Sequence, residues 1–209
     1  MQLPGRGEAV LNCYNKGRDS RPGQLNLEES GCSIMIRVSY EELFNEFKRV
    51  LASRGFEEKM AADAATVFAQ NSLDGIYSHG INRFPRVVSY LDKGEIKPEN
   101  VATCIDAHGA MERWDGHRGF GPLNAKRAMD RACELAKEYG IGLVALGNNN
   151  HWMRGGTYGW QAADQGCIGI CWSNTQPNMP AWGGKDRKIG NNPAPRPAAD
   201  PPHPSRREC

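Results

Sequence analysis

Residues 141–172 read IGLVALGNNNHWMRGGTYGWQAADQGCIGICW, and this stretch decides the fold class. The apolar run 141–146 predicts a buried strand, residues 158–164 a short helix, and the apolar run 168–172 a second strand. Strands joined through a helix usually pair in parallel and carry functional groups in the loop after the first strand. The stretch therefore predicts an α/β unit with candidate site residues in the loop 147–156.

Residues 35–98, upstream of this unit, show helical periodicity. Ser39 and Glu42 have the spacing of a capping box, and apolar residues then recur at helical spacing over 40–54. Further helical patterns cover 60–75 and 84–94. Pro85 either starts or kinks the last of these helices, because proline lacks the amide donor that an interior turn needs.

Residues 99–193 combine strands with a longer helix. Two short runs, 101–106 and 110–115, predict strands joined by a turn, and Pro122 then opens a helical pattern that stops at Gly140. With the unit described above, this pattern predicts a mixed α/β (α+β) fold. A helical N-terminal region is followed by a region with a mixed sheet.

The two ends differ in composition from this patterned middle. Residues 1–34 are rich in glycine and polar side chains without a helical or strand period, which predicts a disordered leader. Residues 194–209 are rich in Pro, Arg and Ala, a composition that favours neither helix nor strand, and we interpret them as a tail foreign to the fold. The predicted folded unit is 35–193, for which Met35 is a natural start.

Charge and composition argue against several classes of function. The 26 basic and 24 acidic residues leave a net charge of +2 without a basic run, so we expect no nucleic acid as a partner. The longest apolar runs are too short to span a bilayer, and we expect no membrane segment. The seven cysteines include no C-x-x-C pair, and residues 1–34 lack the apolar core of a secretory signal. These features favour a cytoplasmic protein with reduced thiols.

The segment 77–86 places His79 four residues before Arg83, which is one turn if the segment is helical. A proton donor and a carboxylate clamp would then share one face, as the reduction of a 2-keto acid requires. Each residue also has an ordinary interpretation. A lone histidine is more often a capping or core residue, and most arginines lie on a solvated surface.

A second candidate site lies in the loop that holds Asn150 and His151, which could orient a carbonyl or a carboxylate. A polar surface loop is an equally good interpretation of these residues. The glycines of 154–159 match neither G-x-G-x-x-G nor a Walker loop, so a standard Rossmann site is not predicted. The histidines lack the spacing of metal ligands, and we expect no metal site.

Three segments together resemble a known family. Residues 77–86, 140–146 and 150–160 read YSHGINRFPR, GIGLVAL and NHWMRGGTYGW. They closely resemble the malate/L-lactate dehydrogenase family of NAD(P)-dependent reductases over about 35–193. The resemblance implies a non-Rossmann dehydrogenase fold and hydride transfer from NADH, with NADPH as the alternative, to a carbonyl of a 2-keto or 2,3-diketo acid.

The resemblance also implies roles for the candidate residues. His79 corresponds to the acid/base of the family, and Arg83 to the arginine that binds the substrate carboxylate. Asn150 and His151 correspond to the substrate-side loop. Asn191 and Asn192 correspond to the stretch near the nicotinamide.

Family chains continue past the position of Pro193 with a segment that completes the cofactor site. The resemblance therefore implies an incomplete fold, truncated after Pro193, in which activity is in doubt. At full length it implies a homodimer. The alternative is a non-catalytic fragment that pairs with an intact dehydrogenase subunit.

Overall fold

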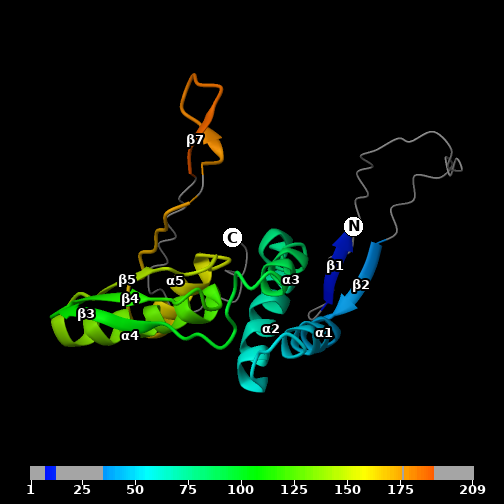
Figure 1. Ribbon diagram of the computed structural model, residues 1–209, viewed down its shortest axis with the longest axis horizontal. Coiled ribbons are helices and arrows are strands. Elements are labelled where there is room, and N and C mark those ends of the chain that lie inside the picture. Colours follow the sequence, from blue (N-terminus) through cyan, green and yellow to red (C-terminus); the bar gives the residue numbers. More distant parts are fainter. Residues whose placement is uncertain (1–7, 13–34, 176, 191–209) are drawn as a thin grey trace, which may run out of the picture.

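The computed structural model describes residues 8–12, 35–175 and 177–190. Helices α1 to α3 lie together on one side of Figure 1, and the sheet β3–β4–β5 with α4 and α5 lies on the other. The elements are β1 Glu8–Asn12, β2 Met35–Ser39, α1 Tyr40–Ala52, α2 Glu58–Leu73, the 3-10 turn η1 Tyr77–His79, α3 Phe84–Asp92, β3 Thr103–His108, β4 Met111–Asp115, α4 Gly121–Tyr139, β5 Leu143–Gly147, α5 Gly156–Asp164, β6 Met179–Pro180 and β7 Arg187–Ile189.

Helix α1 begins at the predicted capping box. The Ser39 hydroxyl accepts a hydrogen bond from the Glu42 amide at 3.2 Å, and the Glu42 carboxylate accepts one from the Ser39 amide at 2.9 Å. These two bonds satisfy backbone donors that the first turn of a helix leaves open. The predicted helix over 40–54 is confirmed, with its end at Ala52.

The helical region is held by a cluster of phenylalanines. Phe47 of α1 and Phe68 of α2 both pack on Phe84 at the start of α3, with ring centroids 4.3 and 5.0 Å apart. Phe120, just before α4, extends the cluster toward the sheet, 6.1 Å from Phe68. Burying one such side chain stabilises the fold by about 1.5–3 kcal/mol. The cluster therefore fixes α3 and the start of α4, the elements that carry the site.

The sheet has the order β3-β4-β5. β3 and β4 form an antiparallel pair, whereas β5 runs parallel to β4 after the crossover through α4. Gly140 ends α4 with a φ of 82°, and a Cβ at Gly142 would lie 2.1 Å from the Ala132 carbonyl oxygen. Only glycine tolerates that approach of backbone to helix. The mixed α/β fold is confirmed, and the three strands lie within two residues of the predicted runs.

One predicted strand is wrong. Burial alternates along residues 168–172 as it would in a strand: Gly169 and Cys171 are buried, and the residues on either side of them are exposed. These residues nevertheless form no strand. β5 bonds to β4 only, and in the described ranges no second strand supplies a ladder for 168–172. We name the exposed residues Ile168, Ile170 and Trp172 the outer strip.

The predicted disordered leader is wrong for one segment. Glu8–Asn12 forms β1 and pairs antiparallel with β2. Its apolar run of three residues is too short to show a strand period, and its hydrogen-bonding partner lies far along the sequence. The remaining positions of 1–34 and the predicted foreign tail 194–209 lie outside the described residues.

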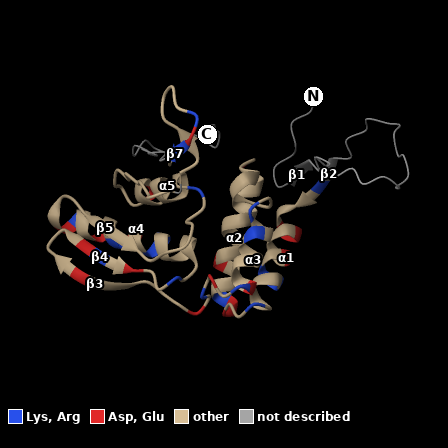
Figure 2. Cartoon of the chain, turned by 45° about the horizontal axis from the view of Figure 1, so that its top comes forward, with Lys and Arg blue, Asp and Glu red and all other residues tan. Residues whose placement is uncertain are grey.

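Charged side chains are mixed over the molecule. Figure 2 shows basic and acidic residues interspersed on the helices and on the sheet, and several form local pairs such as Arg49–Glu46 and Arg131–Glu134. No helix in the part of the chain that the structure describes has the length and apolar character needed to cross a membrane.

Candidate active site

The turn that carries His79 is hydrogen-bonded to the last turn of α2. The Asn71 side chain donates to the His79 carbonyl oxygen at 3.0 Å, and the Ser72 hydroxyl accepts from the Ile81 amide at 2.9 Å. A Cβ at Gly80 would lie 2.4 Å from the Ser72 hydroxyl oxygen and 2.8 Å from the Ser72 nitrogen. The chain can follow this path only because residue 80 has no side chain.

The sequence left open whether His79 and Arg83 share one helical turn, and in the structure they do not. His79 ends η1, while Arg83 is the N-cap of α3, and Pro85 starts this helix rather than kinking it. The turn between them nevertheless keeps the two side chains close. The charge of Arg83 is one cause of the lowered pKa of His79, after burial of the imidazole and before the charge of Arg154.

His151 lies opposite His79, with the two ring centroids 5.7 Å apart. Its Nδ1 accepts a hydrogen bond from the Met153 amide at 2.9 Å, which leaves Nε2 as the protonated nitrogen of the neutral ring. The residue keeps exposed surface, yet burial of the imidazole, then the charges of Arg83 and His79, lower its pKa to about 4. Near neutral pH, His151 is therefore a neutral hydrogen-bond donor.

The sequence profile of one family, described as malate/L-lactate dehydrogenase, matches residues 38–201 of this chain. The chain belongs to the malate/L-lactate dehydrogenase family. The match includes the beginning of the segment that we interpreted as a foreign tail.

Curated relatives in this family carry the name 2,3-diketo-L-gulonate reductase. The protein from Mannheimia succiniciproducens is 57% identical over 158 residues, and that from Pasteurella multocida is 55% identical over the same length. Each alignment covers 76% of this chain and 48% of the relative. The chain thus spans about half the length of the curated relatives that it matches.

Solved structures agree with this assignment. Malate dehydrogenase from Pyrococcus horikoshii OT3 has a TM-score of 0.75 at 33% identity, covering 80% of this chain and 48% of that one. Sulfolactate dehydrogenase from Methanocaldococcus jannaschii has a TM-score of 0.71 at 37% identity, covering 74% and 45%. These likenesses confirm the predicted non-Rossmann dehydrogenase fold.

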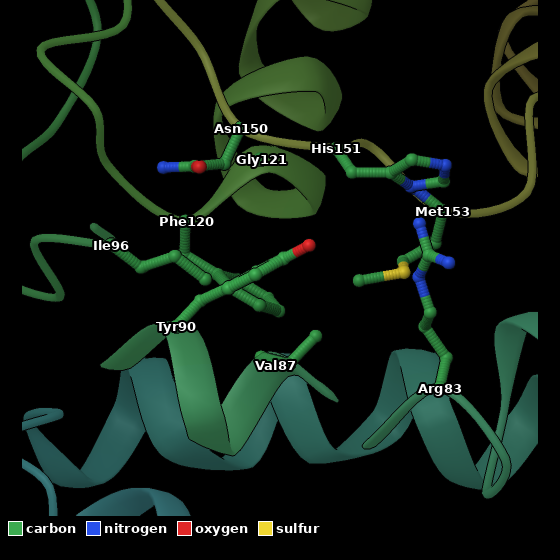
Figure 3. Close-up of a pocket in the computed structure, with 9 residues that line it drawn as sticks. All are labelled: Arg83, Val87, Tyr90, Ile96, Phe120, Gly121, Asn150, His151 and Met153. Atoms are coloured by element: carbon green, nitrogen blue, oxygen red, sulfur yellow. The ribbon is translucent and has the colours of Figure 1, made fainter. Parts of the chain in front are cut away.

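In this member of the family, Arg83 has the properties of a residue that binds an anion. Its guanidinium extends from the start of α3 toward His151 (Figure 3). Burial and the charge of Arg86 lower its pKa from the usual value, and an arginine keeps its charge under such conditions. No carboxylate among the described residues forms an ion pair with Arg83. A partly buried cation without a carboxylate partner is suited to bind a carboxylate ligand.

A narrow pocket adjoins this cation, between α3 and the start of α4 (Figure 3). The cavity volume is about 10 Å³, which is about the space that one water molecule needs and is too small for a keto acid. The pocket by itself therefore does not enclose a ligand of that size. The pocket is lined by Arg83, Val87, Tyr90, Ile96, Phe120, Gly121, Asn150, His151 and Met153.

Asn150 fixes the loop that carries His151. Its amide nitrogen donates to the carbonyl oxygens of Arg118 and Gly119 at 2.8 and 3.0 Å. The side chain points away from His151 in Figure 3. These contacts give Asn150 a role in positioning the loop, and its assignment as a substrate ligand stays a prediction.

The predicted cofactor residues, Asn191 and Asn192, lie outside the described residues. No group of three or more His, Cys, Asp or Glu side chains in the described ranges is placed to hold a metal ion.

The sequence analysis missed the polar residues at the end of α2 that hold the site together. Asn71 and Ser72 are almost completely buried, and Asp74 forms an ion pair with Arg154 at 2.6 Å. The available signal was the run of polar residues that interrupts the alanine-rich pattern of this helix just before the His79 turn. Buried polar side chains in such a helix need partners, and here the partners are the two segments of the site.

Proposed function

We propose that this chain carries the substrate side of a reductase that acts on 2-keto or 2,3-diketo acids, with 2,3-diketo-L-gulonate as the first candidate. One observation carries the proposal: His79, Arg83 and His151 come close together from two segments, the turn 79–83 and the loop after β5, that lie far apart in the sequence. His79 supplies a proton, His151 is a neutral hydrogen-bond donor, and Arg83 binds the carboxylate of the substrate. The names of the curated relatives support the same chemistry.

In this proposal a nicotinamide cofactor supplies the hydride, NADH in the first place and NADPH as the alternative. Arg83 binds the substrate carboxylate through two parallel hydrogen bonds and so fixes the neighbouring carbonyl group. The Nε2–H of His151 donates to an oxygen of the substrate. As the carbonyl carbon accepts the hydride, His79 donates its proton to the oxygen, and the product is a hydroxy acid.

The lowered pKa of His79 has a consequence for this order of events. Near neutral pH the free imidazole is unprotonated, because burial and two guanidinium charges disfavour the cation. A carboxylate at Arg83 offsets one of those charges and raises the pKa of His79. Binding of the substrate therefore prepares the proton donor.

The proposal is tested with two readouts on purified protein. Oxidation of NADH is followed with 2,3-diketo-L-gulonate, and binding of the same acid is measured by calorimetry. We expect Arg83→Gln to abolish binding, and His79→Gln to retain binding but abolish turnover. Arg113→Gln, which changes an exposed arginine on the sheet, is the matched control. Equal binding by Arg83→Gln and the unchanged protein would exclude the proposed clamp.

A second candidate is a non-catalytic fragment that pairs with an intact dehydrogenase subunit. The observation in its favour is the exposed outer strip in a chain that spans about half of its relatives. Co-expression with the tagged, full-length Mannheimia succiniciproducens relative tests it. Recovery of this chain with the tagged protein, reduced when Ile168 and Ile170 are changed to Thr, supports the candidate. Recovery of the tagged protein alone excludes it.

For the full-length enzyme we propose a homodimer located in the cytoplasm. Light scattering on the intact relative and fractionation of cells test these two points.

A further inference from the structure

We propose that Asp74 and Arg154 form a latch that holds the His151 loop against the His79 turn, and that Asp74 is a positioning residue for the site. That the latch serves catalysis rests on the proposed function. Its structural content can be tested without turnover.

The latch joins two segments that are far apart in sequence. Arg154 Nη1 donates to Asp74 Oδ2 at 2.6 Å across a separation of 80 residues. Both side chains are largely enclosed, with 17% and 19% of their surface exposed. By contrast, the Arg49–Glu46 pair on α1 is 68% and 57% exposed. Exposed pairs contribute little to stability, whereas an enclosed pair leaves an unmatched charge when one partner is removed.

Asp74 is itself held in place. It is the C-cap of α2, where its amide donates to the Gln70 carbonyl oxygen, and its Oδ1 accepts from the Gln70 side chain at 2.8 Å. Both carboxylate oxygens are thus engaged. The same turn of α2 presents Asn71 and Ser72 to the His79 turn. One helical turn therefore positions both segments that carry the histidines.

At the other end of the latch, Arg154 directly follows Met153, the residue whose amide fixes which nitrogen of His151 is protonated. The Met153 amide donates to His151 Nδ1, and Met153 holds this position with a φ of 66° and a buried side chain. A non-glycine residue adopts such a backbone only where neighbouring contacts maintain it. The ion pair made by the next residue is one such contact. Releasing Arg154 would free the loop at the point where His151 receives its hydrogen bond.

The latch also acts through charge. His79 faces Arg83 at the start of α3 and both His151 and Arg154 in the loop after β5, with the Ser78 hydroxyl beside its Nδ1. The guanidiniums of Arg83 and Arg154 lower the pKa of His79, and the Asp74 carboxylate offsets part of the Arg154 charge. We therefore expect the two halves of the latch to act on His79 with opposite signs.

The experiment is an NMR titration of the His79 and His151 imidazole protons, assigned with His79→Gln and His151→Gln. Asp74→Asn removes the negative charge that lies beside Arg154, so we expect the His79 midpoint to move to lower pH. In Arg154→Gln a positive charge is removed, and we expect the midpoint to move to higher pH. Asp74→Glu keeps the charge and is expected to restore a value near that of the unchanged protein.

Glu46→Gln, which opens the exposed pair on α1, is the matched control and should leave both titrations unchanged. Opposite shifts in the two latch variants support the proposal. Shifts of the same sign, or none, overturn it. If Asp74→Asn does not fold, the upward shift in Arg154→Gln decides alone. An inactive chain that still shows opposite shifts would count against the proposed function and leave the latch standing.

Discussion

Arg83 acts on both histidines, which gives a prediction at the scale of the residue. Its positive charge is a cause of the lowered pKa of His79 and of His151. In Arg83→Gln we therefore expect both NMR titration midpoints to move to higher pH, that of His151 upward from about 4. Addition of pyruvate, a small keto acid, should raise the His79 midpoint in the unchanged protein, because the bound carboxylate offsets the same charge. The addition should have no effect in the variant.

The exposed Arg113→Gln serves as the control, with both midpoints expected to stay in place. If neither titration midpoint changes in Arg83→Gln, the charge of Arg83 does not act on the two imidazoles.

Protonation of His151 also links stability to pH. Its pKa in the folded chain is lowered to about 4 from the usual value of 6.5, so the unfolded chain binds more protons between these values. Stability should therefore fall as the pH drops from about 6.5 toward 4. His151→Gln should flatten this part of the curve, as measured by urea unfolding at a series of pH values. An unchanged slope would contradict the lowered pKa.

The sequence predicted His79, Arg83 and His151 as site residues because a few residue types suit the chemistry, and the structure brings these three side chains together. Their geometry could not be found in the same way. The path between His79 and Arg83 depends on Asn71 and Ser72, which reach it from another helix. Contacts of this kind leave no periodic signal in the segment that they shape.

At the scale of the element, Gly80 is the position where α2 and the His79 turn come closest. A Cβ there would meet the hydroxyl and the nitrogen of Ser72 at 2.4 and 2.8 Å. We expect Gly80→Ala to destabilise the chain by about 1–3 kcal/mol, the usual cost of overpacking. Gly156→Ala is the control, because the nearest atom to its Cβ would be the Arg154 side chain at 3.6 Å. Urea unfolding of both variants gives the comparison.

The contribution of Ser72 to this clash can be tested as well. Ser72→Ala removes the nearer oxygen together with its hydrogen bond to the Ile81 amide, so it lowers stability by itself. In the Ser72→Ala background, however, Gly80→Ala should cost less stability than in the unchanged protein, although some cost remains because the backbone nitrogen stays. Equal stability of Gly80→Ala and Gly156→Ala would mean that the turn can move away from α2 without cost.

The helices were predictable at this scale because their signals are local. The capping box of α1, Pro85 at the start of α3 and Gly140 after α4 all lie at or next to the ends of the helices that they bound. The run 168–172 has the composition of a strand, but a strand also needs a neighbour. Whether one is present depends on the rest of the molecule rather than on the run itself.

At the scale of the whole molecule, the outer strip is the feature that sets this chain apart from a closed fold. Ile168, Ile170 and Trp172 are 72%, 55% and 63% exposed, whereas Cys171 between them packs on Ala125 and Tyr158. An apolar strip beside backbone groups without a ladder partner is a surface on which chains associate. We therefore expect self-association that increases with concentration.

Ile168→Thr combined with Ile170→Thr should reduce this self-association, as measured by light scattering, and leave the thermal midpoint nearly unchanged. Threonine keeps the extended backbone preference and removes apolar surface that makes few contacts in the folded chain. Trp182→Thr is the control, because Trp182 is fully exposed in the hairpin of β6 and β7, which stands away from the sheet in Figure 1. If Trp182→Thr disperses the chain and the double variant does not, association proceeds through the hairpin and the outer strip plays no part in it.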